Sequence, residues 1–430
     1  MGISIQSVLA EGFTCPVRDV LWGHIYFTPE LSALTDSAPF MRLHRILQLG
    51  PVYRLYPGAT HTRASHSIGV YHLGRRLLQN LAERGADWIS RQGAMSFLCA
   101  CLLHDLGHFP YTHSLKELPL RPHESLTGEI ILKEPMKSLV ARCGADPELA
   151  AAIVDDHGES AASDSVELLF YRKLLSSCLD PDKLDYLNRD ARYCGVPYGI
   201  QDVDFILSRL VPNPERGVDI DSRLIPNVEA ILFAKYLMYR TVYWHRQVRA
   251  CTAMIKKALL EALELGSVTG DELYGLDDQS LFALLREKTG STLADAVWKG
   301  RLFSVAAEIP YNEADHACLR DIGKRSLYEK QLAQEFRSGG VPLGPGDLII
   351  DLPEPISFET GLFVLDEKRD FASSTSAFKA EPFVKTLYTI RIFLNPDFCK
   401  KIETLPQLYD ILYSKKNWLT GGEYGTSQRF

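Results

Sequence analysis

The stretch CLLHDLGHFPYTH, residues 101–113, ends an apolar run with side chains that can do chemistry: His104, Asp105, His108 and His113. Such side chains are unfavourable in a protein core unless a partner compensates their polarity or charge. Imidazole and carboxylate groups bind divalent cations, and imidazole also transfers protons near neutral pH. The stretch therefore indicates a metal site, a proton relay or a polar turn at the end of a helix.

Two residues from distant parts of the chain extend this group. His66 lies within THTRASHSIGV, and Asp182 lies within LDPDKLDYLNRD. With His104 and Asp105 they would form a set of two imidazoles and two carboxylates. This mixture suits a divalent transition metal better than calcium, which prefers oxygen ligands. The open coordination positions would accept water and a phosphate oxygen, a layout typical of metal-assisted phosphoester hydrolysis.

Two further groups could serve a phosphate substrate. His108, His113, His123 and Glu124 lie close together in the sequence and could supply a proton to a leaving oxygen. The second group offers the cationic and phenolic donors that a polyphosphate requires: Arg63, Lys183, Tyr186, Arg189, Lys235 and Tyr243. Taken singly, each histidine is better explained as a satisfied polar side chain, and each cationic or phenolic residue as part of a surface ion pair; the function is inferred from the groups together.

The composition narrows the class of protein. The chain has 430 residues, is 46% hydrophobic and carries a net charge of -7, which does not favour a nucleic acid as partner. Its nine cysteines form no CxxC pair, which indicates reduced thiols and a cytoplasmic location. No apolar run approaches the roughly 20 residues that a membrane span requires, so we expect no membrane association.

Hydrophobic periodicity predicts a mostly α-helical fold. The residues VLWGHIYFTP suggest a hairpin before the first helix. Helices are predicted over residues 32–49, 66–84, 90–104, 123–142, 148–157, 164–178 and 182–194. The longest periodic stretch, residues 229–265, predicts one buried helix or two kinked ones.

The sequence changes character after about Gly339, where GGVPLGPG reads as a connector. The short runs DLIIDLP, GLFVL and TLYTIRIFLN favour strands, and a helix is expected near residues 404–415 before a loose tail. We therefore predict a helical catalytic region over residues 1–330 and a small α+β region over residues 331–430.

The motifs together resemble a known family. HRILQLGPVYRLYPGATHTRASHSIGV, HDLGHFPYTH, the His-Glu pair at 123–124 and DPDKLDYLNRD, in this order, are similar to those of the HD-domain phosphohydrolases. The layout is closest to the stand-alone bacterial deoxynucleoside triphosphate triphosphohydrolases, without the sterile-alpha-motif domain of the mammalian enzyme. The resemblance covers roughly residues 19–400 and implies an HD-domain helical core with a small α+β C-terminal part.

The resemblance also implies roles for individual residues. The metal ligands would be His66, His104, Asp105 and Asp182, and the cofactor a divalent ion, with Mn, Fe, Mg, Co, Ni and Zn as candidates. His113 would donate the proton to the leaving 5′ oxygen. His108 and His123 would bind the reacting phosphate, with Glu124 orienting a neighbour. The remaining matched positions are substrate contacts, to the sugar or to the triphosphate: Gln48, Leu49, Tyr186, Asp190, Tyr243, Arg63 and Lys183.

Four positions depart from the family pattern. Ser65 precedes the first metal histidine where a glutamate is common, and Lys116 follows His113 where an acidic residue is common, with Glu117 next. Lys235 and Tyr239 stand where the family has a triphosphate-binding arginine and a histidine, and lysine lacks the bidentate fork of arginine.

The function that the resemblance implies is hydrolysis of dNTPs at the α-phosphorus, giving a deoxynucleoside and inorganic triphosphate. Two alternatives stay open. One is an HD phosphohydrolase acting on a nucleoside monophosphate, a cyclic dinucleotide or an alarmone; the other is a nucleotide sensor without turnover. The family also implies a homodimer or homotetramer, with a nucleotide activator at a subunit interface.

Overall fold

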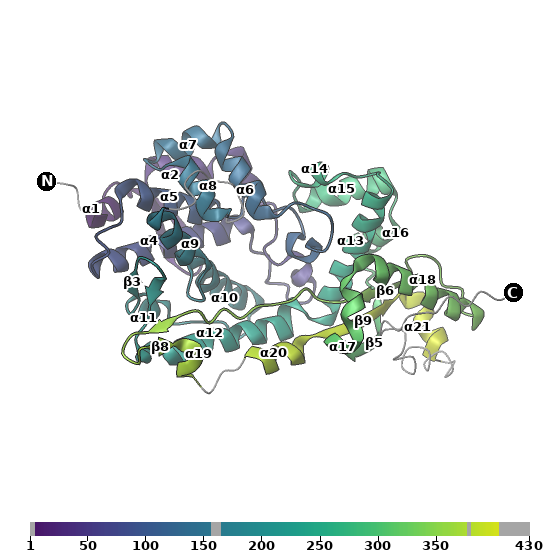
Figure 1. The fold of residues 1–430 in the computed structure, drawn as a ribbon. Helices are drawn as coiled ribbons and strands as arrows, with labels where there is room; N and C mark the ends of the chain where they lie inside the picture. The colour runs from purple at the N-terminus through teal and green to yellow at the C-terminus, as the bar shows by residue number, and fades with distance from the viewer. Residues whose placement is uncertain (1–4, 156–164, 376–379, 404–430) are drawn as a thin grey trace.

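The computed structural model describes residues 5–155, 165–375 and 380–403. Figure 1 shows two lobes: a larger helical lobe built from α1 to α12, and a second lobe where α13 to α18 surround a small sheet. Helix α12 (Ile225–Met238) and α13 (Arg246–Glu264) run from one lobe into the other. The predicted fold class, mostly α with a small α+β part, is confirmed.

The N-terminal elements form a hairpin and three short helices. Strands β1 (Cys15–Asp19) and β2 (Gly23–Phe27) pair antiparallel; the hairpin therefore begins earlier than the predicted VLWGHIYFTP, which contains only the turn and β2. The single helix predicted over residues 32–49 is wrong. The chain instead forms α2 (Pro29–Thr35) and α3 (Ala38–Leu43), because Pro39 follows the capping position Ser37 and opens a new helix. Helix α1 spans Ile5–Ala10.

The helices that surround the HD motif follow. They are α4 (Arg63–Glu83), α5 (Arg91–Leu103), α6 (His123–Leu132), α7 (Met136–Arg142), α8 (Pro147–Val154), α9 (Val166–Ser176) and α10 (Pro181–Cys194). The helix predicted over 123–142 is therefore two helices, because Pro135 cannot continue α6. The other helices predicted here are present, with ends that differ by a few residues.

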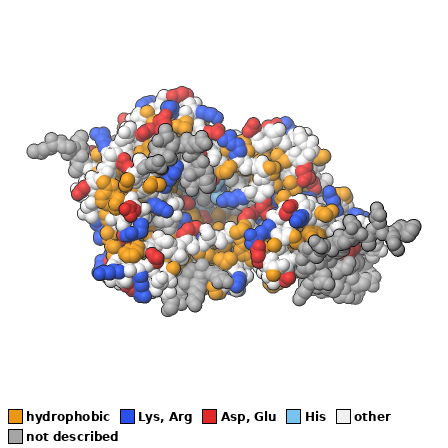
Figure 2. All heavy atoms as spheres, viewed as in Figure 1, with side chains coloured by type: hydrophobic (Ala, Val, Ile, Leu, Met, Phe, Trp, Pro, Cys, Tyr) orange, Lys and Arg blue, Asp and Glu red, His pale blue; other side chains and the backbone are white. Residues whose placement is uncertain are grey.

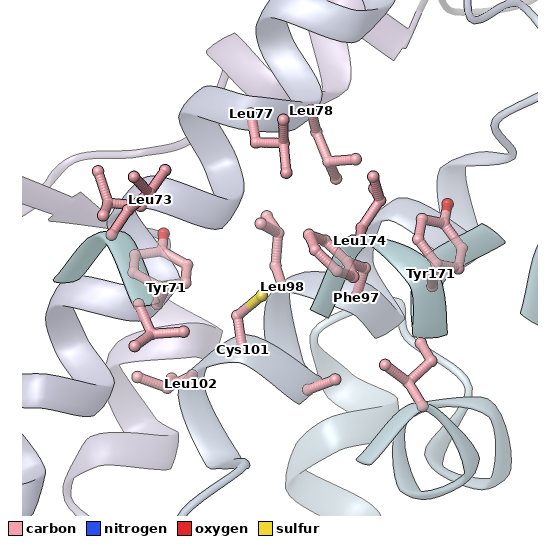
Figure 3. Packing of buried hydrophobic residues seen from close by; sticks show 14 of the residues in the cluster. Tyr71, Leu73, Leu77, Leu78, Phe97, Leu98, Cys101, Leu102, Tyr171 and Leu174 are labelled. Carbon is pink, nitrogen blue, oxygen red and sulfur yellow. The ribbon is translucent and has the colours of Figure 1, made fainter. Parts of the chain in front are cut away.

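The first hydrophobic core lies between α4, α5 and α9 (Figure 3). Leu73, Leu77 and Leu78 of α4 face Leu98 of α5 in this view. Phe97 of α5 stacks on Tyr171 of α9, with ring centroids 5.2 Å apart. From Gly93 to Leu103 every residue of α5 is buried, which fixes the helix end that carries His104.

The stretch predicted as one helix or two kinked ones is two. A π-turn at Tyr239–Tyr243 separates α12 from α13, so the tyrosines of the turn lie where the helical path changes. Just before α12, α11 (Val203–Leu207) leads into a hairpin of β3 (Val211–Asn213) and β4 (Gly217–Asp219).

The second lobe holds a three-stranded antiparallel sheet in the order β5-β9-β6. Its strands are β5 (Ser304–Pro310), β6 (Leu348–Asp351) and β9 (Thr389–Leu394). A short pair, β7 (Phe363–Val364) and β8 (Arg369–Asp370), lies beside the first lobe. The remaining helices are α14 (Gly270–Leu273), α15 (Asp278–Thr289), α16 (Thr292–Trp298), α17 (Glu313–His316), α18 (Ile322–Ser338), α19 (Phe371–Ser374), α20 (Ala380–Leu387) and α21 (Pro396–Glu403), of which α19 lies beside β8 at the first lobe.

Three predicted β-runs in the C-terminal part contain β6, β7 and β9. Strand β5 lies before residue 330 yet pairs with β9, so the sheet takes strands from both sides of the predicted boundary. The division into residues 1–330 and 331–430 stays a prediction. The helix expected near 404–415 and the loose tail lie outside the described residues.

The surface carries mixed charges. In Figure 2, Lys and Arg side chains are interspersed with Asp and Glu side chains over this face of the molecule. Within the described ranges, none of the helices combines the length and the apolar character that a membrane crossing requires.

Candidate metal centre and active site

The end of α5 positions the HD pair. Ser90 caps the start of this helix, and His104 stands at its C-cap, so that the chain turns directly after it. Gly107 makes the next turn compact, because a Cβ there would lie 2.1 Å from the backbone oxygen of His123. The start of α6 therefore packs against the turn and brings His123 beside His108.

Three of the predicted metal ligands converge. His66 of α4, His104 and Asp182 of α10 each offer one ligand atom, and these three atoms lie within 4.8 Å of one another. His66 Nε2 is 3.0 Å from Asp182 Oδ1. Asp182 lies in the first turn of α10, two residues after its N-cap Asp180. The site thus joins the N-terminal turns of two helices to the C-terminal end of a third.

The hydrogen bonds behind the two histidines leave the right nitrogens free for a metal. His66 Nδ1 lies 2.8 Å from Asp185 Oδ2, and His104 Nδ1 lies 3.0 Å from the carbonyl oxygen of Cys101. Because both partners are acceptors, each Nδ1 can keep its proton in this bond, so that each Nε2, which faces a neighbouring carboxylate, would be the ligand atom for a bound cation. Histidines that ligate metals are typically oriented in this way, so the donor set fits a divalent cation.

Asp105 stands beside this triad with other close partners. Its Oδ1 is 3.3 Å from His104 Nε2 and 3.0 Å from His108 Nδ1. Its Oδ2 accepts a hydrogen bond of 2.9 Å from Arg63 Nη1. The Asp105 carboxylate is buried and has a pKa well below its ordinary value: burial raises the pKa, but His108, His104 and Arg63 outweigh that effect. It is an ionised group that links the metal ligands to the neighbouring histidines.

Three of the four residues predicted as catalytic form a second cluster. The Nε2 atoms of His108 and His113 are 3.1 Å apart, and the rings of His108 and His123 have centroids 3.7 Å apart. The fourth residue, Glu124, places Oε2 3.0 Å from His123 Nδ1. His113 is the exposed histidine of the three.

The environment favours neutral imidazoles in this second cluster. Desolvation is the largest cause, and nearby positive charges add to it: together they lower the pKa of His108, His113 and His123 well below that of free imidazole. Arg63 contributes to the lowering at all three. An anion placed among these rings would favour their protonated forms. The cluster can therefore hold a proton when an anionic ligand arrives.

The residues predicted to face a sugar are linked through Asp190. Its Oδ1 is 2.8 Å from His61 Nε2, and its Oδ2 accepts a hydrogen bond of 2.5 Å from the Tyr243 hydroxyl. The backbone of His61 pairs with that of Gln48, whose side-chain Oε1 is buried. Among the described residues, neither this oxygen nor His61 Nδ1 has a hydrogen-bond partner. Leu49 is half-buried and follows Gln48 directly.

The predicted cations lie near the N-terminus of α10 and on α12. Lys183 Nζ donates to Asp180 Oδ2 at 2.8 Å, and Lys235 Nζ donates to the Ser357 carbonyl at 2.7 Å. Both lysines also face Glu359, with Nζ–Oε2 distances of 4.0 Å and 3.1 Å respectively. Arg63, predicted as a triphosphate contact, pairs with Asp105 through Nη1 at 2.9 Å.

The remaining two predicted substrate residues lie nearby. Tyr186 is half-buried on α10, one helical turn after Asp182. Tyr239 opens the π-turn and packs edge-on against Tyr243, with ring centroids 5.1 Å apart. Both aromatic groups thus border the same end of the site as Asp190.

Ser65, a departure from the family pattern, and Glu117, the acidic residue next to the departure Lys116, both have partners in the structure. Ser65 forms a capping box with Thr62 at the start of α4. Glu117 pairs with Lys256 and Arg325, so its carboxylate is committed away from His113.

Sequence reasoning missed three residues of the site: Asp185, His61 and Glu359. Asp185 and His61 stand inside quoted motifs, so their types offered a signal. Nothing local marked Glu359.

Two known families match the chain in succession. The HD domain matches residues 63–190, and the HD associated region matches residues 206–388. The first match includes His66, His104, Asp105 and Asp182, and the second includes the sheet strands β5 and β6.

Curated relatives cover part of this chain. The uncharacterized protein YwfO of Bacillus subtilis is 34% identical over 54% of this chain and 52% of its own length. The deoxynucleoside triphosphate triphosphohydrolase SAMHD1 of Bos taurus is 27% identical over 80% of this chain and 64% of its own length. The chain spans about half the length of the first curated relatives it matches, at 52–55%.

Solved structures share the fold. A hypothetical protein from Aquifex aeolicus has a TM-score of 0.69 at 24% identity, over 90% of this chain and 98% of its own. A phosphohydrolase from Bacteroides thetaiotaomicron has a TM-score of 0.68 at 23% identity, over 88% of this chain and 99% of its own.

Proposed function

The chain belongs to the HD-domain superfamily, and from that premise we propose that it is a metal-dependent phosphohydrolase that cleaves dNTPs at the α-phosphorus. The observation that carries the proposal is the pair of adjoining clusters. His66, His104 and Asp182 form a metal-ligand set, and Asp105 connects it to His108 and the other histidines. Relatives named deoxynucleoside triphosphate triphosphohydrolases support the choice of substrate.

The metal-ligand residues would place a divalent cation where it can bind a phosphate oxygen. A bound divalent cation supplies Lewis-acid activation of a phosphoryl oxygen and of water. His66, His104, Asp182 and Asp105 would hold it; its identity, with Mn, Fe, Mg, Co, Ni and Zn as candidates, is part of the proposal. Asp185 keeps His66 Nδ1 protonated, so that Nε2 stays available as a ligand atom.

The histidine cluster would supply the proton that the leaving 5′ oxygen needs. Water attacks the α-phosphorus and forms a P–O bond, the bond from phosphorus to the 5′ oxygen breaks, and the proton that the water loses passes to solvent. His113, the exposed member of the three, gives a proton to that oxygen, and its Nε2 lies against His108 Nε2. The anionic phosphate raises the pKa of these imidazoles toward neutral pH, because opposite charges favour the protonated form.

The other predicted residues would orient the nucleotide. Gln48 would bond the 3′ hydroxyl, Leu49 would crowd a 2′ hydroxyl, and Asp190 would lie on the sugar side. The buried Gln48 Oε1 and the paired Asp190 carboxylate are polar groups suited to a hydroxyl. Tyr186 and Tyr243 would border the sugar and base. Lys183 and Lys235 would meet the phosphate tail, with Tyr239 beside them.

A product assay tests the proposal. Purified protein with Mn is incubated with each dNTP alone and with all four together, and the products are separated by ion exchange. We expect a deoxynucleoside and inorganic triphosphate. His66→Ala should lower the rate more than ~100-fold, because losing a metal-supporting partner alone costs about 10–100-fold. His24→Ala is the control, since His24 is exposed on β2.

Other outcomes would redirect the proposal. Activity that survives in His66→Ala would contradict the metal assignment. Release of orthophosphate, or cleavage of a monophosphate, a cyclic dinucleotide or an alarmone alone, would favour another HD phosphohydrolase. Tight dNTP binding without any product would indicate a sensor.

Assembly and regulation belong to the same proposal. We expect a homodimer or homotetramer in the cytoplasm, with a nucleotide activator at a subunit interface, as the family resemblance implies. Light scattering with and without dNTPs measures the assembly. Turnover that requires the mixture of dNTPs would identify an activator.

A further inference from the structure

A segment of the C-terminal part lies over the cationic side of the proposed site. Residues 352–362 connect β6 to β7 without helix or strand, and Figure 1 shows this connection running beside α12 from the second lobe back to the first. One end is held where Arg249 pairs with Glu354, and the other where β7 pairs with β8. The segment is therefore fixed at both ends and passes the lysines between them.

The middle of this segment encloses Lys235. Its ammonium group donates to the Ser357 carbonyl, lies 3.1 Å from Glu359 Oε2 and sits 5.4 Å from the centre of the Phe358 ring. The Ser357 hydroxyl in turn donates to Glu359 Oε1 at 2.8 Å, which orients the carboxylate. As a result only 8% of the Lys235 side chain is exposed.

Glu359 also reaches the second predicted tail contact. Lys183 Nζ lies 4.0 Å from Glu359 Oε2, the same oxygen that faces Lys235. One carboxylate oxygen thus lies between two ammonium groups, as a phosphate oxygen would in a polyphosphate complex. Lys183 also pairs with Asp180, so both lysines already have carboxylate partners in this structure.

From this geometry we propose that Glu359 is a specificity-determining residue: it competes with the phosphate tail of the substrate for Lys183 and Lys235. This inference rests on the proposed function, which places a nucleotide tail at these lysines. A single phosphate at the metal ligands need not displace Glu359, whereas a tail that extends to the lysines must. Glu359 therefore sets how strongly the length of the tail contributes to binding.

Calorimetry with inorganic phosphates tests the competition without any turnover. The full chain and Glu359→Gln are titrated with inorganic tripolyphosphate and with orthophosphate. We expect the Kd for tripolyphosphate to fall about tenfold in Glu359→Gln, the change that accompanies ~1.4 kcal/mol. The Kd for orthophosphate should stay within about twofold. Glu367→Gln is the control, because Glu367 pairs with Arg369 outside the segment.

Two further variants keep the test decisive. In the double variant Glu359→Gln/Lys235→Gln, compared with Lys235→Gln, the gain should be smaller, since only the more distant Lys183 is freed. Glu359→Asp keeps the charge with a shorter reach and should give a smaller gain, which serves if Glu359→Gln folds poorly.

An unchanged tripolyphosphate affinity in a folded Glu359 variant would overturn the inference. So would a gain of undiminished size in the double variant, or a wild-type chain and variant that both fail to bind tripolyphosphate. The result is separable from the product assay: a gain in affinity without dNTP cleavage would contradict the proposed function and leave the competition standing.

Discussion

At the residue scale, Asp185 is the side chain on which the proposed metal site most depends. Its Oδ2 bonds His66 Nδ1 and Arg189 Nε, and its Oδ1 accepts from Trp22 Nε1 at 2.6 Å. Arg189 is itself fully buried and also bonds Asp19. The carboxylate thus fixes the tautomer of a metal ligand and balances a buried guanidinium.

We expect Asp185→Asn to weaken metal binding about 10–100-fold, because an amide nitrogen facing His66 no longer holds the proton on Nδ1. Competition with a chelating dye measures the metal affinity, and thermal unfolding reports folding. Asp204→Asn, which removes an exposed partner of Arg76, is the control. Unchanged metal affinity in Asp185→Asn would show that the carboxylate supports packing alone.

At the element scale, the approach of α4 to α10 decides whether His66 meets Asp182. Gly69 allows this approach, since a Cβ at this position would lie 1.9 Å from Asp185 Oδ1 and 2.4 Å from Arg189 Nη2. Two long helices from distant parts of the chain therefore pack closely where one of them lacks a side chain. The helix ends then supply the site residues.

Gly69→Ala should force the two helices apart and cost ~1–3 kcal/mol of stability, the usual cost of overpacking a core. We also expect weaker metal binding, because His66 lies three residues before Gly69. Urea unfolding and the dye competition measure the two effects. Gly275→Ala is a matched control, because no heavy atom lies within 4 Å of its added methyl.

At the scale of the whole molecule, a buried ion pair joins α13 to the sheet. Arg249 donates from Nη2 to Asp351 Oδ1 at 2.6 Å and from Nε to Asp351 Oδ2 at 2.8 Å. Burial raises the pKa of Asp351, but Arg249 outweighs it and the pKa lies below its ordinary value. The pair holds β6, and with it the start of the 352–362 segment, against α13.

Asp351→Asn should lower the free energy of unfolding by about 3 kcal/mol near neutral pH, because it leaves a buried guanidinium without its counter-charge. A lowered carboxyl pKa stabilises the fold above the unfolded value of about 3.9. The difference from the wild type should therefore shrink as pH falls below about 4.

Urea titrations at several pH values measure this dependence. Glu308→Gln removes an ion pair with Arg391 that is partly exposed on the same sheet, and should cost under ~1 kcal/mol. A difference that does not change with pH would contradict the ionic explanation.

Residue types and their periodicity were enough to predict the candidate site and the predominance of helix. His66, His104, Asp105 and Asp182 are legible because few side chains bind divalent cations and because flanking motifs place them at helix ends. Periodicity located most helices, since burial of one face imposes the 3.6-residue repeat. Periodicity did not reveal the helix breaks near Pro39 and Pro135. The apolar spacing is judged over a window of many residues, so one proline within that window changes it little.

The partners of the site residues from distant parts of the chain become visible only in the folded structure. Asp185 meets His66 across 119 residues of sequence, His61 meets Asp190 across 129, and Glu359 meets Lys235 across 124. The pairing of β5 with β9 is likewise non-local. A single carboxylate has no local signature of its partner. Its role emerges only when packing excludes water and leaves one counter-charge within reach.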